Sequence, residues 1–284
     1  MGEPIGEQES ERSEQLLGEQ KTLKITINPL FIFKLTTLKD YMGIALEKLS
    51  TDLENCSRGG FPEVESGLQP EKTYKKEPLF ITFEGGEGTG KSTQAELFHS
   101  WFLEEYGSAI LTREPGGVKV SEDIRSVLLN PENEISGLTE LLLFEAARTE
   151  FVEKVVSPNI EFKKSVVSDR FYDSTTAYQG YGRNLSLEII DYLNNLAVSR
   201  DEKSYHPNLT FLIDIDPEIG LERAGKRGEL NRLDKESAEF HEKVRFGFLE
   251  IAKNNFNRVV VIQGDNSVDE VQSEIKEEFS KRYL

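Results

Sequence analysis

The chain has 284 residues, which is enough for one large α/β domain or two small ones. Hydrophobic residues make up 37% of the chain, so a sizeable core can form. Acidic residues outnumber basic ones by 51 to 34, and the formal net charge of −17 opposes binding to nucleic-acid backbones or anionic membranes. The single cysteine, Cys56, excludes an internal disulfide bond and fits a reducing compartment.

The sequence shows no membrane span and no targeting signal. Its best apolar stretch, residues 30–33, is far shorter than the ~20 residues that cross a bilayer. The chain starts with acidic residues, whereas secretory and transit peptides start with basic ones. We therefore expect a cytoplasmic protein that binds neither membranes nor nucleic acids.

Residues 1–76 differ in character from the rest of the chain. The first 20 are rich in Glu, Gln, Ser and Gly, which bury little apolar surface. Residues 22–53 carry scattered apolar side chains, which fit either a strand and a helix or an irregular arm, and a linker follows. We expect a partly disordered N-terminal extension of unknown function. It could bind a partner or regulate the rest of the chain, but we favour a dispensable extension.

From residue 77 to residue 284 short apolar runs alternate with helical patterns. The runs expected to be strands are residues 79–83, 109–111, 165–167, 209–213 and 259–262. This alternation predicts an α/β domain with a mostly parallel sheet of about five strands and helices on both faces.

A phosphate-binding loop follows the first of these strands. Residues 85–92 read Gly-Gly-Glu-Gly-Thr-Gly-Lys-Ser, which matches G-x-x-x-x-G-K-[ST] without a mismatch. Such a loop lets backbone N–H groups converge on phosphate oxygens, and its Lys reaches the β- and γ-phosphates. The pattern predicts a P-loop NTPase-type fold that binds ATP, through Gly85, Gly86, Glu87, Gly88, Thr89, Gly90, Lys91, Ser92 and Thr93. No Asn-Lys-x-Asp guanine-binding motif is present, so a GTPase is disfavoured.

Further polar groups follow other strands. Asp169 and Arg170 end the run at 165–167, where parallel sheets bind their ligands. Asp169 can hold Mg²⁺ together with the Ser92 hydroxyl, and Arg170 can clamp a phosphate, although both could instead form a surface ion pair. Arg113 follows another strand beside an open Pro-Gly-Gly turn.

Two other segments have alternative interpretations. Phe144 and Arg148 lie four residues apart in a helical stretch, so a ring and a donor share one face and suit a planar base. Taken alone, Phe144 would more often be a core residue. The basic run from Arg223 to Arg232 is usually a solvated helix face, but it could be a mobile lid over transferring phosphates.

Together these motifs resemble the thymidylate kinase family over nearly everything from Leu79 to the C-terminus. The most specific segments are Thr-Arg-Glu-Pro-Gly-Gly at 112–117 and Asp-Arg-Phe-x-x-Ser-x-x-Ala-Tyr-Gln at 169–179. The resemblance implies transfer of the γ-phosphoryl group of ATP to dTMP, giving dTDP and ADP with Mg²⁺, by a homodimer. The alternatives are another nucleotide or nucleoside kinase, or a non-catalytic nucleotide-binding scaffold.

The resemblance also implies roles for single residues. Glu87 contacts the sugar 3′-hydroxyl, Phe144 stacks on thymine and Arg148 donates to its O4. Thr175 lies where the family contacts N3, and Tyr178 where it crowds the sugar 2′ position. The arginines that grip the monophosphate are Arg113 and Arg170, and the 169–179 motif adds Ser174 and Gln179 to the substrate-binding residues.

The sequence departs from the family pattern in the lid, which we expect at about residues 223–235. No arginine stands beside Glu87, and members that lack it use lid arginines, so Arg223 and Arg227 are candidates for stabilising the transition state. Gly225 and Asn231 replace an arginine and an aspartate found in relatives, which leaves the roles of the single lid residues open. Glu87, Lys91, Arg170, Arg223 and Arg227 form the expected catalytic set.

Overall fold

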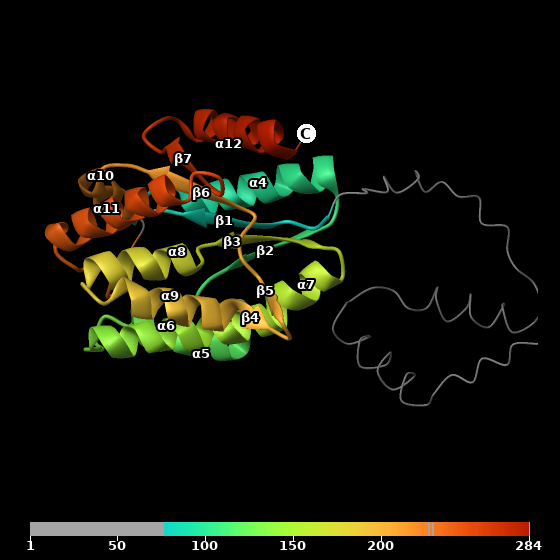
Figure 1. Cartoon of the computed structure of the whole chain (residues 1–284). Helices are drawn as coiled ribbons and strands as arrows, with labels where there is room; N and C mark the ends of the chain where they lie inside the picture. The colour runs from blue at the N-terminus through green and yellow to red at the C-terminus, as the bar shows by residue number, and fades with distance from the viewer. Residues whose placement is uncertain (1–76, 227, 229, 284) are drawn as a thin grey trace, which may run out of the picture. The chain divides into compact units, whose positions relative to one another are not determined.

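The computed structural model describes residues 77–226, 228 and 230–283, and its chain course is shown in Figure 1. The N-terminal extension expected at residues 1–76 lies outside the described residues, and so does the lid residue Arg227.

A five-stranded parallel sheet forms the centre of the described residues, in the order β2-β3-β1-β6-β7. Its strands are β1 (Phe80–Glu84), β2 (Ala109–Arg113), β3 (Ser165–Asp169), β6 (Leu209–Asp214) and β7 (Val259–Gln263). All five apolar runs expected to be strands are strands, so the predicted fold class is confirmed. A short hairpin pairs β4 (Ser199–Arg200) with β5 (Lys203–Ser204).

Helices cover both faces of this sheet (Figure 1). The chain contains α4 (Lys91–Tyr106), α5 (Lys119–Leu129), α6 (Gly137–Phe151), η1 (Val152–Val156), α7 (Ser157–Glu161), α8 (Tyr172–Thr175), η2 (Thr176–Gly182), α9 (Leu187–Val198), α10 (Pro217–Gly225), α11 (Ala238–Asn254) and α12 (Val268–Tyr283). None of the helices within these described residues is long and apolar enough to cross a membrane.

Alternation along the strands sorts side chains onto the two faces. In β1, Ile81 and Phe83 pack with Phe98 of α4 and Phe279 of α12 in one cluster. Phe80 points the other way and packs with residues of α6, η1 and β3. Thr82 and Glu84 share the parity of Phe80, so the side chain of Glu84 leaves the sheet on the side opposite to α4.

Candidate active site

The phosphate-binding loop connects the end of β1 to the start of α4. Gly88 has a φ of 68° and packs against α10, where an added Cβ would lie 1.9 Å from the carbonyl oxygen of Gly220. Only glycine fits this close approach and this left-handed conformation. Gly90 is the N-cap residue of α4 and provides no side-chain hydrogen bond. Because α4 begins here, the positive end of its helix dipole faces the loop.

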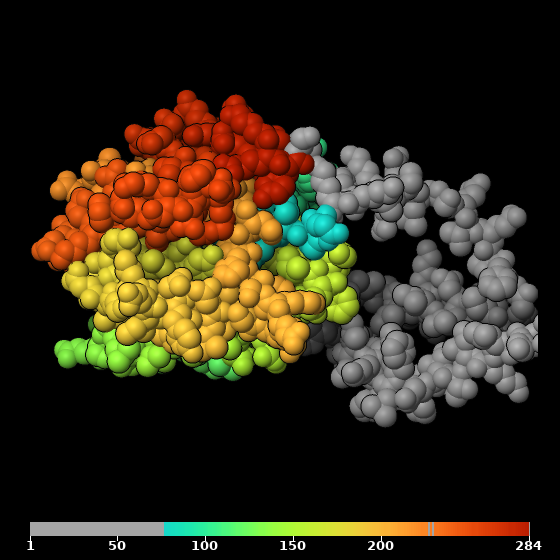
Figure 2. All heavy atoms as spheres, viewed as in Figure 1, coloured from blue at the N-terminus to red at the C-terminus, as the bar shows by residue number. Residues whose placement is uncertain are grey.

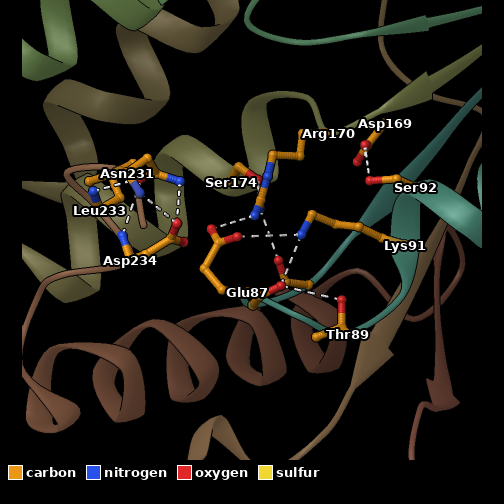
Figure 3. A network of polar contacts seen from close by, with 12 residues as sticks. Glu87, Thr89, Lys91, Ser92, Asp169, Arg170, Ser174, Asn231, Leu233 and Asp234 are labelled. Carbon is orange, nitrogen blue, oxygen red and sulfur yellow. Dashed lines mark hydrogen bonds and ion pairs between the residues drawn. The ribbon is translucent and has the colours of Figure 1, made fainter. Parts of the chain in front are cut away.

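Lys91 points back into the loop (Figure 3). Its Nζ donates to the carbonyl oxygen of Gly86 at 2.9 Å and lies 4.0 Å from a carboxylate oxygen of Glu87. Burial lowers the pKa of Lys91, and the nearby Arg170 guanidinium adds to this, while the carboxylates of Glu87 and Asp169 oppose it. The ammonium group is therefore fixed at the centre of the loop.

Arg170 directly follows β3, and its side chain contacts the phosphate-binding loop at the end of the neighbouring strand β1. Its Nη2 donates to Glu87 Oε1 at 2.7 Å and to the Tyr178 hydroxyl at 3.3 Å, and its Nη1 donates to the Gly85 carbonyl oxygen at 2.9 Å. Tyr178 also donates to Glu87 Oε1, at 2.8 Å. Burial would raise the pKa of Glu87, but Arg170 and Lys91 outweigh it and hold the pKa at about 2. Glu87 is therefore a carboxylate throughout the neutral range.

Asp169 and Ser92 meet beside Lys91, as Figure 3 shows. The Ser92 hydroxyl donates to Asp169 Oδ2 at 2.5 Å. The other carboxylate oxygen, Oδ1, is buried and has no hydrogen-bond partner among the described residues. A hydroxyl and a carboxylate are hard oxygen ligands, so this pair fits Mg²⁺. In such sites Mg²⁺ takes its remaining ligands from waters and from the phosphates of the substrate.

A cavity of about 220 Å³ opens beside the loop. It brings together all nine expected substrate-binding residues, which lie on the loop after β1, on β2, α6, α8 and η2, and directly after β3: Glu87, Arg113, Phe144, Arg148, Arg170, Ser174, Thr175, Tyr178 and Gln179. Lys91, Ser92 and Asp169 line the same space. Residues from positions 87 to 179 thus converge on one site, although their single roles stay predictions.

Arg148 lies at the inner end of this cavity and is only 1% exposed. Its Nε forms an ion pair with Glu114 at 2.8 Å, its Nη1 donates to Glu145 and Asn194, and its Nη2 donates to Thr175 at 2.8 Å. Three of the five guanidinium N–H groups thus donate hydrogen bonds, whereas the Nε contact with Glu114 is an ion pair without a hydrogen bond. Among the described residues, one Nη2 hydrogen is left for a ligand in the cavity.

Two carboxylates share this one guanidinium. Burial and the neighbouring Glu145 raise the pKa of Glu114, Arg148 lowers it, and the net pKa is about 8. Burial therefore opposes ionisation of Glu114, and the Arg148 guanidinium favours it. Arg148 is thus held as a cation in an apolar wall formed by Phe144, which is 9% exposed, and Phe171, whose ring centroid lies 5.5 Å from the guanidinium carbon.

Arg125 is a cavity residue that the sequence analysis missed. It comes from α5, and its Nη1 donates to the Pro115 carbonyl oxygen at 3.0 Å. Burial lowers its pKa, and the neighbouring Arg113 and Arg170 add to this effect, which indicates a group of three guanidiniums. Arg113 itself is 54% exposed and pairs with Glu122 at 3.0 Å. No local sequence pattern marked Arg125 as a cavity residue.

Some of the expected lid residues line the cavity and others do not. Arg223 is not among the residues that line the cavity, because its Nη1 donates to the carbonyl oxygen of Gly264 at 3.0 Å. Asn231 and Leu233 do line it, and Asn231 is fixed by hydrogen bonds to Asp234 (Figure 3). Arg232 pairs with the buried Glu140 at 2.6 Å. The base of the lid therefore closes one side of the cavity, while Arg223 lies apart from it.

Comparisons with known proteins agree with this site. The family model for thymidylate kinase matches residues 83–275. The thymidylate kinase of Acholeplasma laidlawii is 44% identical over 207 residues, covering 72% of this chain and 100% of the relative, and that of Maridesulfovibrio salexigens is 45% identical over 213 residues, covering 72% and 96%.

A solved structure gives the same result. The crystal structure of thymidylate kinase from Ehrlichia chaffeensis superimposes with a TM-score of 0.58 at 37% sequence identity, covering 72% of this chain and 99% of that chain. With a matching family model, full-length relatives and a shared fold, this chain belongs to the thymidylate kinase family.

Proposed function

We propose that this protein is an ATP-dependent dTMP kinase, which transfers the γ-phosphoryl group of ATP to dTMP and gives dTDP and ADP for dTTP synthesis. The observation that carries the proposal is the position of Arg170. It contacts Glu87 of the phosphate-binding loop on one side and lines the nucleotide-sized cavity on the other. A phosphate donor and a monophosphate acceptor therefore meet at one guanidinium.

The base end of the cavity suits thymine. Phe144 offers an apolar wall for stacking, and the remaining Nη2 hydrogen of Arg148 can donate to O4. Thr175, for which the family resemblance implies a contact with N3, lines the same cavity, and so does Gln179. The Tyr178 ring, only 3% exposed, limits the space near the sugar, which favours deoxyribose.

The phosphate end supplies positive charge. We assign the ATP phosphates to residues 85–93 and the dTMP phosphate to Arg170 and Arg113, and we add Arg125 because it lines the same cavity. Magnesium bound at Ser92 and Asp169 would neutralise charge on the phosphate oxygens when present. The dTMP phosphate oxygen is already largely ionised near pH 7, since the second pKa of such a phosphate is about 6, so no general base is needed.

Catalysis then depends on positioning and charge. Lys91 and Arg170 hold the reacting phosphates at fixed points and stabilise the charge that spreads over the transferred group. Glu87, a carboxylate at neutral pH, orients Arg170 and can accept from the sugar 3′-hydroxyl. Arg223 would reach the phosphates only after leaving Gly264, so we propose that the lid rearranges before transfer.

We further propose a cytoplasmic homodimer. Helices α6 and α9 pack together and present exposed apolar side chains that repeat every three or four residues: Leu138 and Leu142 on α6, and Ile189, Tyr192 and Leu196 on α9. Figure 2 shows atoms of the two helices side by side on the lower part of the surface. Such a contiguous apolar surface supports association between copies, and the single cysteine supports the location.

The proposed activity is tested with a substrate panel. We expect rapid turnover of ATP with dTMP and much slower turnover with dUMP, dCMP, dGMP or thymidine, measured as ADP release. Lys91→Ala and Arg170→Ala should each lower kcat on the order of a thousandfold, while circular dichroism still shows a folded protein. Preference for another acceptor would contradict the proposal, and binding of both ligands without product would favour a scaffold.

Base recognition is tested by Arg148→Lys. Arg148→Ala is a poor choice, because it would leave Glu114 and Glu145 without their cation. Lysine keeps the charge but loses the fork of N–H groups, so we expect the KM for dTMP to rise about tenfold or more and the KM for ATP to stay unchanged. Arg245→Lys, which weakens a bidentate pair with Asp214 outside the cavity, is the matched control. Equal losses for both substrates would rule out a base contact.

The domain organisation is tested by truncation. We propose that residues 77–284 are the catalytic unit and residues 1–76 an extension outside it. A chain starting at residue 77 should phosphorylate dTMP with the kcat and KM of the full-length protein, since every cavity-lining residue lies between Glu87 and Leu233. A large loss of kcat in a truncated chain that still melts cooperatively would show that the extension takes part in the reaction.

The dimer is tested by Leu142→Glu. A charge in the middle of the apolar surface should change the mass measured by light scattering from twice the chain mass of 32.2 kDa to once that mass. Phe256→Glu is the control, because Phe256 is also exposed but lies in the loop between α11 and β7. A monomeric wild type, or a dimer that survives Leu142→Glu, would remove this surface from consideration.

A further inference from the structure

Glu84 is a buried carboxyl group to which the proposed function gives no role. It is the last residue of β1, directly before the phosphate-binding loop, and it is 0% exposed. It does not line the cavity, so it contacts neither of the proposed substrates. Its side chain leaves the sheet toward α8, on the face opposite to α4.

The Glu84 carboxylate caps the short helix α8 from another part of the chain. Its Oε1 accepts from the backbone N–H groups of Phe171, at 2.7 Å, and Ser174, at 3.4 Å, and its Oε2 accepts from the Ser174 hydroxyl at 2.6 Å. Phe171 is the N-cap residue of α8 and provides no side-chain cap of its own. A carboxylate at a helix N-terminus both satisfies these donors and interacts favourably with the helix dipole.

This cap lies directly after a strained residue. Arg170 has a φ of 75°, a left-handed conformation that a residue with a Cβ adopts only when its surroundings impose it. Phe83 accepts from the Arg170 backbone N–H at 2.9 Å, and Glu84 holds the next residue, Phe171. The end of β1 thus fixes the backbone on both sides of the Arg170 peptide.

The same carboxylate also reaches the Arg170 side chain through one hydroxyl. Ser174 donates to Glu84 Oε2 and accepts from Arg170 Nη1 at 3.0 Å, so the three groups form a chain. The direction of the Ser174 hydroxyl hydrogen is set by Glu84, which leaves the oxygen lone pairs free for the guanidinium. The guanidinium is then aimed at Glu87 and the cavity.

We propose that Glu84 is a positioning residue, which holds Arg170 in the geometry that phosphoryl transfer needs by capping α8 and orienting Ser174. The inference rests on the proposed dTMP kinase activity and deepens it.

Charge supports the same conclusion. Burial and the Asp173 carboxylate raise the pKa of Glu84, Arg170, Ser174 and Phe171 lower it, and the net pKa is about 7. If Glu84 served only to fill the core, an apolar residue would do so without the free-energy cost of burying a carboxyl group. Its three accepted hydrogen bonds and its cationic neighbour give it a use that an apolar residue cannot replace.

Glu84→Gln is the variant that isolates this role. The amide has almost the same shape, but its NH₂ group meets Ser174 or the helix N-terminus with a donor where an acceptor is needed. We expect kcat/KM for dTMP to fall about tenfold or more, as for loss of outer groups that orient a reactive one, with ATP affinity unchanged. Thr82→Val is the matched control, since it removes a buried hydrogen bond to Thr210 from the same strand and face and leaves the hydrogen bonds of Glu84, Arg170 and Ser174 in place.

A double-mutant cycle separates positioning from general stability. If Glu84 acts through Arg170, then Glu84→Gln should have no further effect on kcat in the Arg170→Ala background. Independent, multiplicative losses would overturn the proposal, and so would wild-type kcat/KM in Glu84→Gln. Should Glu84→Gln fail to fold, Ser174→Ala in the same cycle decides, because it cuts the chain between Glu84 and Arg170; multiplicative losses there would also overturn it.

The same assays test the dTMP kinase activity and the role of Glu84 separately. Wild-type protein that does not phosphorylate dTMP contradicts the proposed function. Wild-type protein that is active while Glu84→Gln and Thr82→Val show equal rates contradicts only the role of Glu84.

Discussion

The contact between Glu87 and Arg170 connects the two halves of the site. Glu87 belongs to the loop after β1 and Arg170 follows the neighbouring strand β3, and their side chains meet at 2.7 Å while both are about 15% exposed. Parallel pairing brings these strand ends together, with Phe83 opposite Asp169 in the register. The sheet therefore sets the distance between the phosphate-binding loop and the guanidinium, and the ion pair sets their orientation.

Such partly buried charges, and the fully buried Arg148, are costly to desolvate, so their surroundings must compensate them. Arg170 also donates to Gly85, Ser174 and Tyr178, and Arg148 has two carboxylates, an amide and a hydroxyl around it. Removing one partner from a buried pair of this kind typically costs about 3–5 kcal/mol. The left-handed backbone at Arg170 adds a further cost of about 1–3 kcal/mol. The hydrophobic core must offset the cost of the buried charges and the cost of the left-handed backbone. Both costs are acceptable at a site whose function depends on the positions of its charged groups.

The sequence predicted the elements and the motifs that depend on local patterns. Each apolar run from Leu79 onward became a strand, and the P-loop stands where a strand meets a helix. The same patterns could not predict the partners of Arg148, because Glu114 and Asn194 are 34 and 46 residues away and no local pattern pairs either of them with Arg148. Arg125 was missed for a related reason: a single Arg in an amphipathic helix becomes a cavity residue only through the packing of α5.

The residues that line the cavity carry an excess of positive charge, although the chain as a whole is acidic. The lining contains five cationic side chains and three carboxyl groups, in a protein with a net charge of −17. One of these carboxyl groups, Glu114, is buried beside Arg148, and burial opposes its ionisation. At physiological salt the acidic exterior is screened beyond about 8 Å. Nucleotide phosphates therefore interact mainly with the cations inside the cavity, where burial limits screening and the guanidiniums are already oriented.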